Sequence, residues 1–483
     1  MNIEKKYNRG AKIVLFISLM AIPMQLITSA LISRISSEAS GALGILEIFY
    51  NVIVAFFVLG GETGIIKLLT DRREIKSKKN FISKYIVICI FFFLIVAVGL
   101  RLFKFDIIKI VTGQENSTSV LMYIVALFII INNILLAYIK ESEKFIHYAI
   151  GIKLFNLGNL LSVLYVSFIG KSADINIILL IVMGMLQLIN VTFIIIKEKI
   201  FLGITVKKHE KIDYRILKYI FFLYLSTILA FLYDKIDQII VVNKLGLSIL
   251  GGYYLIIKVV NMVKLIPNTY NSTFYPYICK QLKKENANFI FNNILSKNLL
   301  FIFPMTVLIV LNSDLIITVL FGVVYLKYGL LLQILTGIVL FSAPNVILNN
   351  FLYALEKSNK YFWISFISVL VEIMVIYCFI DKTGLVIVPI SKCCANLSIL
   401  ILSKISLEKM GYKVKLPFKY YIYNIILIVD LIVTNMIQLS GIIYIILSLI
   451  IIGIFALNNR QYLLKILKDI TKKIKEKNNE FIE

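Results

Sequence analysis

Charged side chains are scarce in this chain of 483 residues, at 16% of the sequence, whereas soluble domains carry about 25%. Hydrophobic residues make up 60%, and the mean hydropathy is +0.90. So little charge excludes an ordinary soluble domain. The composition therefore indicates a membrane protein.

Cysteine and histidine are too few and too scattered to suggest a metal centre. The five cysteines lie in or at the ends of apolar segments, without the spacing of metal ligands, and we expect buried, inert thiols. They are Cys89, Cys279, Cys378, Cys393 and Cys394. Two histidines, His147 and His209, are expected to be ordinary polar residues. We expect neither a metal site nor catalytic residues.

Signatures of nucleotide hydrolysis are also missing. The sequence has no GxxxxGK[ST] phosphate-binding loop, so we expect no ATP hydrolysis by this chain. The connectors between apolar runs are too short for an extramembrane catalytic domain on either side. The sequence therefore predicts a protein that is not an enzyme.

Long apolar runs are abundant. About 20 apolar residues suffice for one helical crossing of a bilayer, where the backbone must satisfy its own hydrogen bonds. We therefore expect an all-α polytopic membrane protein with about 14 transmembrane helices. They are expected at residues 13–33, 42–66, 84–103, 119–139, 146–169, 175–196, 217–242, 250–276, 298–321, 328–354, 361–380, 384–405, 420–438 and 441–457.

The net charge of +24 is a signal of topology rather than of nucleic-acid binding. Most of the 51 Lys and Arg residues fall in alternate connectors and in the two tails, and cytoplasmic loops are enriched in these residues. We therefore expect a multi-pass protein of the plasma membrane, with both termini in the cytoplasm. The tail 458–483 suits either a basic amphipathic helix on the inner leaflet or a solvated charged segment.

The chain also repeats itself. The segments ISRISSEASGAL and VNKLGLSILGGY align so that Gly41 matches Gly251. We predict two pseudo-symmetric six-helix lobes in the same orientation, 1–200 and 201–410, followed by two extra transmembrane helices and a basic cytoplasmic tail in 411–483. Parallel repeats are a transporter architecture in which the substrate lies between the halves.

Ionisable side chains inside the expected spans are the candidates for function. Such a group costs about 2.5–3.5 kcal/mol near the bilayer centre, so it should face protein or a water-filled cavity. The lysines predict a cationic cavity, and structural ion pairs with Asp234 and Asp237 are the alternative. The candidate binding lysines are Lys258, Lys235, Lys264, Lys153 and Lys392. Residues expected to be polar cavity residues or to couple an ion are Glu47, Asn51, Asp234, Asp237, Asn261 and Gln25.

The expected span 250–276 has the clearest polar stripe. At 100° per residue, Lys258, Asn261 and Asn268 fall within about a third of the helix circumference. Amides and hydroxyls also join helices in membranes, so packing is the alternative for them. Lysine favours a cavity, because leucine would pack as well.

A cationic cavity in a membrane transporter suits a phosphate group, which lysine binds as a point charge. The head group of a lipid diphosphate could pass between the lobes while its tail stays in the bilayer. Each negative charge moved out of a cell with a negative interior gains about 2.3 kcal/mol per 100 mV. We therefore expect a lipid with a polyanionic head group as the substrate.

Two segments resemble a known family. Residues 234–276, with the motif LGGYY and Lys258, resemble spans 7–8 of bacterial polysaccharide-biosynthesis export proteins. Those are the Wzx-type O-antigen (lipid-linked oligosaccharide) flippases of the multidrug/oligosaccharidyl-lipid/polysaccharide (MOP) superfamily. Residues 34–67, with the motifs GALG and GG, resemble the opening segment of that family. The resemblance covers roughly residues 10–410 at low identity.

This resemblance implies a V-shaped pair of lobes in the bacterial plasma (inner) membrane. They would flip an undecaprenyl-diphosphate-linked oligosaccharide, an O-antigen, capsule or exopolysaccharide repeat unit, to the outer leaflet by alternating access. Basic cavity residues of the family correspond by position to Arg34, Lys235 and Lys258. Implied partners are the lipid-linked glycan, membrane lipid, a polysaccharide polymerase and glycosyltransferases. No cofactor is expected, with proton or sodium coupling as an option.

Three alternatives remain open. A flippase for lipid II, the peptidoglycan precursor, is one, because the extra pair of helices resembles the pair that forms a lipid groove in that branch. A cation-coupled multidrug exporter is the second, but Lys258 and Lys264 in one span argue against it. A membrane enzyme of polysaccharide synthesis is the third, and it would need an outer loop or acidic catalytic pair that is not evident.

Overall fold

The computed structural model describes residues 3–70, 75–102, 119–168, 175–200, 214–355, 357–436 and 441–460. These residues form helices joined by short turns, without a strand among them, and the expected all-α class is confirmed. Eleven helical stretches of the described chain are long and apolar enough to cross a membrane, and one of them, 359–408, contains two helices. The protein is therefore a multi-pass membrane protein. Residues 461–483 of the predicted amphipathic tail and His209 lie outside the described residues.

Each expected span falls on a helix or on two consecutive helices. The first half contains α1 (Ile3–Ser33), α2 (Ser37–Phe57), α3 (Gly61–Thr70), α4 (Ile75–Leu102), α6 (Ser119–Glu141), α7 (Phe145–Phe168) and α8 (Ile175–Glu198). The second half contains α9 (Tyr214–Leu245), α10 (Leu247–Gln281), α11 (Ala287–Leu311), α12 (Ser313–Leu320), η1 (Val323–Tyr328), α13 (Gly329–Phe341), α14 (Ala343–Ala354), α15 (Ser358–Thr383), η2 (Gly384–Val386) and α16 (Ile387–Glu408). The last pair is α17 (Phe418–Met436) and α18 (Gly441–Asn458).

Three spans expected to be continuous are broken. The span 42–66 divides into α2 and α3 at Gly60 and Gly61, whose φ angles of 75° and 59° suit residues without a Cβ. The span 328–354 divides at Ser342, just before Pro344 in the first turn of α14. The span 298–321 divides at Asn312. Hydropathy does not detect such breaks, because the chain stays apolar on both sides of them.

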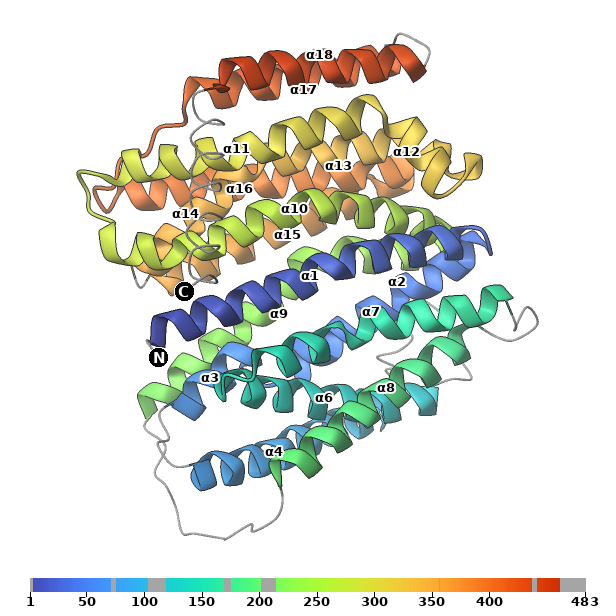
Figure 1. Ribbon diagram of the computed structural model, residues 1–483, viewed down its shortest axis with the longest axis vertical. Coiled ribbons are helices and arrows are strands. Elements are labelled where there is room, and N and C mark those ends of the chain that lie inside the picture. Colours follow the sequence, from blue (N-terminus) through green and yellow to red (C-terminus); the bar gives the residue numbers. More distant parts are fainter. Residues whose placement is uncertain are drawn as a thin grey trace, which may run out of the picture.

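Figure 1 shows the helices of the two halves side by side, with α1, α2, α9 and α10 in the middle and α17 and α18 at one end of the long axis. Helix boundaries recur between the halves. The interval from the start of α2 (Ser37) to that of α10 (Leu247) equals the interval from the start of α6 (Ser119) to that of α13 (Gly329). The domain limits at residues 200 and 410 stay a prediction.

Small residues bring the halves together where α2 and α10 begin. A Cβ atom on Gly251 would lie only 1.9 Å from the Ser37 carbonyl oxygen, and one on Gly41 would lie 2.4 Å from the Leu247 carbonyl oxygen. The Ser37 and Ser248 hydroxyls form a hydrogen bond of 2.7 Å across the contact. Small residues allow such close backbone approach in membranes. We call this contact, residues 34–41 with 245–252, the closed end.

The expectation that the cysteines are buried is right for Cys89 and wrong for Cys279 and Cys378, which are exposed. Cys393 and Cys394 are half-buried. The reason is that a helix of a membrane protein is apolar on its lipid-facing side too. An apolar neighbourhood in the sequence therefore does not indicate burial inside the protein.

Candidate functional site

A cavity of about 810 Å³ lies beside the helices at the centre of the molecule. The first half contributes Glu47 and Asn51 from α2 and Lys153 from α7 to its lining. The rest comes from the second half, from α9, α10, α11, α13, α14, α15 and α16 and from Ser342 between α13 and α14. Along α10 the lining runs from Tyr253 to Asn271, away from the closed end. From the closed end, the cavity therefore extends along α10 toward the C-terminal end of that helix.

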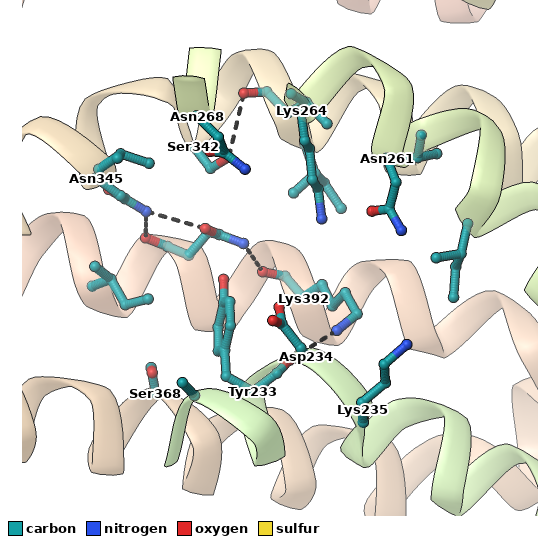
Figure 2. A pocket seen from close by; sticks show the side chains of 18 of the residues that line it. Tyr233, Asp234, Lys235, Asn261, Lys264, Asn268, Ser342, Asn345, Ser368 and Lys392 are labelled. Carbon is teal, nitrogen blue, oxygen red and sulfur yellow. Dashed lines mark hydrogen bonds between the residues drawn. The ribbon is translucent and has the colours of Figure 1, made fainter. Parts of the chain in front are cut away.

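Lysine and amide side chains of α10 point into this cavity. Figure 2 shows Lys264 and Asn261 directed toward α9, where Asp234 and Lys235 face them. Among the described residues, neither Lys264 nor the other lining lysine, Lys153, has a hydrogen-bond or ion-pair partner. Two cationic groups are thus available to a bound anion.

Glu47 is held by two lysines of the other half. Its Oε1 accepts a hydrogen bond of 2.8 Å from Lys235 of α9, and its Oε2 accepts one of 2.5 Å from Lys258 of α10. The Lys258 ammonium also lies over the Tyr254 ring, 4.8 Å from its centroid, an arrangement that stabilises a cation. Glu47 and Lys235 line the cavity, whereas Lys258 lies outside its lining.

Lys392 of α16 is the centre of a second cluster. Its ammonium lies 3.0 Å from Glu372 Oε1 and 3.3 Å from Asp237 Oδ2, and it donates to the Tyr233 carbonyl oxygen at 3.2 Å. The Tyr253 hydroxyl donates to Asp237 Oδ2 at 2.5 Å. Both carboxylates are fully buried, and Asp237 Oδ1 and Glu372 Oε2 have no hydrogen-bond partner in the described chain. The cluster has two acidic groups for one lysine.

The expected cationic cavity is only weakly cationic. Its lining holds four lysines and three carboxylates, from Glu47, Asp234 and Asp237. Lys392 forms the expected kind of ion pair, with Asp237. Lys235 and Lys258 pair with Glu47 instead of Asp234 or Asp237. A buried charge needs such a partner in a low-dielectric surrounding. The free positive charge comes from Lys264 and Lys153.

Most of the predicted site residues come together. The cavity is lined by Lys153, Lys235, Lys264, Lys392, Glu47, Asn51, Asp234, Asp237 and Asn261. Lys258 contacts Glu47, which lines the cavity, but is not itself part of the lining. Gln25 lies on α1, which contributes no residue to the lining. Arg34 is exposed in the turn between α1 and α2, away from the cavity. The correspondence of Arg34 with a cavity residue of the resembling family stays a prediction.

Sequence reasoning did not assign Glu372 or the tyrosines of the Lys392 cluster to the site. The signal for Glu372 was a lone carboxylate inside the apolar run 361–380. Tyr233 and Tyr253 gave no signal as site residues, because tyrosine is common in this chain, with 27 residues. The amide pair Asn345 and Asn396, joined at 3.1 Å between α14 and α16, also lines the cavity (Figure 2).

Comparisons with known proteins relate this architecture to transporters. No protein-family model matches the chain, and no curated protein matches its sequence. Its structure is similar to that of the lipid II flippase MurJ in an inward closed conformation, with a TM-score of 0.72, 15% identity, and coverage of 93% of this chain and 99% of that one. The chain has the fold of MOP-superfamily transporters. A MATE family multidrug resistance transporter of that superfamily, in an inward-facing conformation, gives a TM-score of 0.59 at 12% identity and covers 83% of this chain and 98% of its own.

The charged groups of the cavity are suited to binding an anion. The described residues contain no group of three or more His, Cys, Asp or Glu side chains that could hold a metal ion. The arrangement offers unpaired ammonium groups in a cavity next to a contact between the halves. The narrower resemblance to Wzx-type flippases stays a prediction.

Proposed function

We propose that the protein is a flippase for a polyprenyl-diphosphate-linked glycan. It moves the glycan from the inner to the outer leaflet of the bacterial plasma membrane by alternating access and makes or breaks no covalent bond. The observation that carries the proposal is the cavity beside the closed end, in which Lys264 and Lys153 have no partner among the described residues. These lysines would bind the diphosphate.

The size and position of the cavity support this substrate class. Its volume of about 810 Å³ lies in the range of pockets that hold small ligands, about 300–1,000 Å³. A diphosphate and its first sugars could occupy it, while the polyprenyl tail stays among lipids. The membrane potential would favour outward movement of the anionic head group.

Two kinds of glycan are candidates for the substrate. An O-antigen, capsule or exopolysaccharide unit is our first candidate, on the strength of the sequence resemblance in α9 and α10. Lipid II is the alternative, and the similarity of the fold to a structure named as a lipid II flippase makes it the comparison to test. A cationic drug is less well supported, because the lining has one positive charge in excess of its carboxylates.

We also propose that a proton or sodium ion drives the cycle. The carboxylates of Asp237 and Glu372 outnumber Lys392 in their cluster, and each has an oxygen without a partner in the described chain. A proton or small cation there would balance the charge. A polysaccharide polymerase and glycosyltransferases are the proposed partners, because they would consume and supply the glycan.

Flipping can be measured with purified protein in proteoliposomes. A fluorescent polyprenyl-diphosphate-linked oligosaccharide, fluorescent lipid II or ethidium is loaded inside, and a membrane-impermeant quencher reports its appearance outside. We expect movement of a diphosphate lipid and none of ethidium. Lys264→Gln should slow it about tenfold or more, because a hydrogen bond to a charged group contributes about 1.5–3 kcal/mol.

The matched control is Lys409→Gln, which removes an exposed lysine outside the cavity and should leave the rate unchanged. Transport of ethidium without transport of either diphosphate lipid would refute the flippase function and indicate a drug exporter instead. Equal rates for Lys264→Gln and Lys409→Gln would remove Lys264 from the binding site.

A further inference from the structure

Glu47 connects the two halves of the molecule by two ion pairs. Glu47 lies on α2, whereas Lys235 lies on α9 and Lys258 on α10. Each oxygen of the Glu47 carboxylate contacts one of the two ammonium groups. The side chains are only 16%, 11% and 9% exposed, respectively. The carboxylate is therefore bound in a site that two cations of the other half create.

Lys258 has a further contact besides Glu47. Lys258 lies over the ring of Tyr254, its neighbour one turn earlier on α10. That ring packs closely on α2, because a Cβ atom on Gly44 would lie 3.3 Å from it. Two positive charges against one negative charge leave an excess of one positive charge, so the pair of lysines suits an anion with more charge than a carboxylate.

The ion pairs and the closed end lie on the same two helices. Glu47 follows Ser37 by ten residues on α2, about 15 Å at the rise of an α-helix. Lys258 follows Ser248 by ten residues on α10. Because α2 and α10 are continuous between these points, a rigid movement that parts the two helices at the closed end also pulls on the ion pairs of Glu47.

Separation with an empty cavity would leave a carboxylate and two ammonium groups without partners in a largely buried place. Loss of one partner from a buried ion pair is strongly destabilising. A diphosphate that enters the cavity can compensate, since Lys235 and Glu47 both line it and Lys264 lies in the same lining. The diphosphate can contact the lysines as Glu47 departs.

We propose that Lys235 and Lys258 form an anion site that Glu47 fills while the cavity is empty, and that the diphosphate of the substrate displaces Glu47 from it. Displacement frees α2 from α9 and α10, so the closed end opens only when an anionic head group is bound. This inference rests on the proposed function for the nature of the anion. It adds a role for Glu47, which is a tether between the halves rather than a ligand of the substrate.

The closed end itself provides the assay. Ser37→Cys and Ser248→Cys, placed in a protein whose five cysteines are replaced by alanine, should form a disulfide readily, because the two hydroxyls lie 2.7 Å apart. The rate of copper-catalysed oxidation in lipid nanodiscs reports closure. Farnesyl diphosphate is the lipid probe and inorganic pyrophosphate is the probe without a lipid tail.

We expect farnesyl diphosphate to slow cross-linking about fivefold or more, in the usual range for coupling between two sites. Glu47→Gln should slow it to a similar degree without any probe. The control Glu285→Gln neutralises an exposed carboxylate in the turn after α10, outside the cavity lining, and it should cross-link at the parent rate. If inorganic pyrophosphate slows cross-linking as well, the site recognises the two phosphates without the lipid tail.

Unchanged cross-linking in Glu47→Gln would overturn the tether. Slowing in that variant, with no effect of either probe on the parent, would overturn displacement by an anion. If Glu47→Gln does not fold, Glu47→Asp is the second variant, because its shorter side chain cannot reach both lysines. The readout involves no transport, so failure of lipid flipping in proteoliposomes refutes the proposed function separately.

Discussion

Lys392 shows how a charged side chain is accommodated inside this bundle. Its ammonium lies between the buried carboxylates of Glu372 and Asp237, and a backbone carbonyl accepts a further hydrogen bond from it. Burial of an unpaired charge is strongly unfavourable, which explains why these groups occur together. At the scale of residues, Lys392 is a lysine whose buried partners make it part of the structure, whereas Lys264 and Lys153 are unpaired in the described chain and available to a ligand.

This distinction predicts the effect of Lys392→Met on stability. The substitution leaves two buried acidic groups without a cation, and loss of one partner of a buried pair costs about 3–5 kcal/mol. Thermal unfolding of the purified protein in detergent should therefore shift to clearly lower temperature. Lys409→Met, at an exposed site, should change stability by less than about 0.5 kcal/mol. Equal unfolding temperatures for the two variants would refute the structural role of Lys392.

At the scale of elements, the crossing of α2 and α10 determines how closely the halves approach. Gly41 and Gly44 on α2 and Gly251 on α10 leave room for the facing helix. The sequence repeat aligned Gly41 with Gly251, and the structure places both at this contact. The equivalent positions of the two copies thus meet each other at the closed end.

Gly251→Ala should weaken this crossing. Its Cβ atom would overlap the Ser37 carbonyl oxygen, a backbone atom that cannot turn away, and overpacking typically costs about 1–3 kcal/mol. The melting temperature in detergent should fall relative to the parent. Gly99→Ala is the matched control, since a Cβ atom there meets nothing within 4 Å. A melting temperature of Gly251→Ala as high as that of the control would contradict the close packing.

At the scale of the whole molecule, the two ends of the bundle differ. The Lys244 ammonium lies 3.4 Å from Asp381, which places the end of α15 beside the end of α9 at the closed end. The connector after α10 lies at the opposite end of that helix and is rich in lysine. Excess positive charge marks the cytoplasmic side, so we expect the closed end to face outward.

Cysteine labelling tests this orientation. In a protein without its native cysteines, an impermeant maleimide applied to intact cells should label Lys382→Cys, in the last turn of α15. It should leave Lys284→Cys, after α10, unlabelled. Both positions are exposed, so both should react after the membrane is permeabilised. Labelling of Lys284→Cys alone in intact cells would reverse the topology.

Much of the fold and part of the site could be predicted. The apolar runs located the membrane-crossing stretches of the described chain but not the breaks within three of them, because length and hydropathy are local properties. The same reasoning found Lys235, Lys264 and Asp237, since charge inside an apolar run is conspicuous. The sequence does not show which way Arg34 points, because the direction of a side chain depends on how the helices pack.

The sequence by itself determined that the chain spans the membrane as helices, where those helices lie, and which few charges accompany them into the bilayer. Only the tertiary structure decided which charges are paired. Glu47 and Lys258 are 211 residues apart, and they meet because glycines let α2 approach α10. The hydrophobicity of a segment depends only on residues that are neighbours in the chain. An ion pair depends on the distance between two charged groups, and the packing of the helices sets that distance.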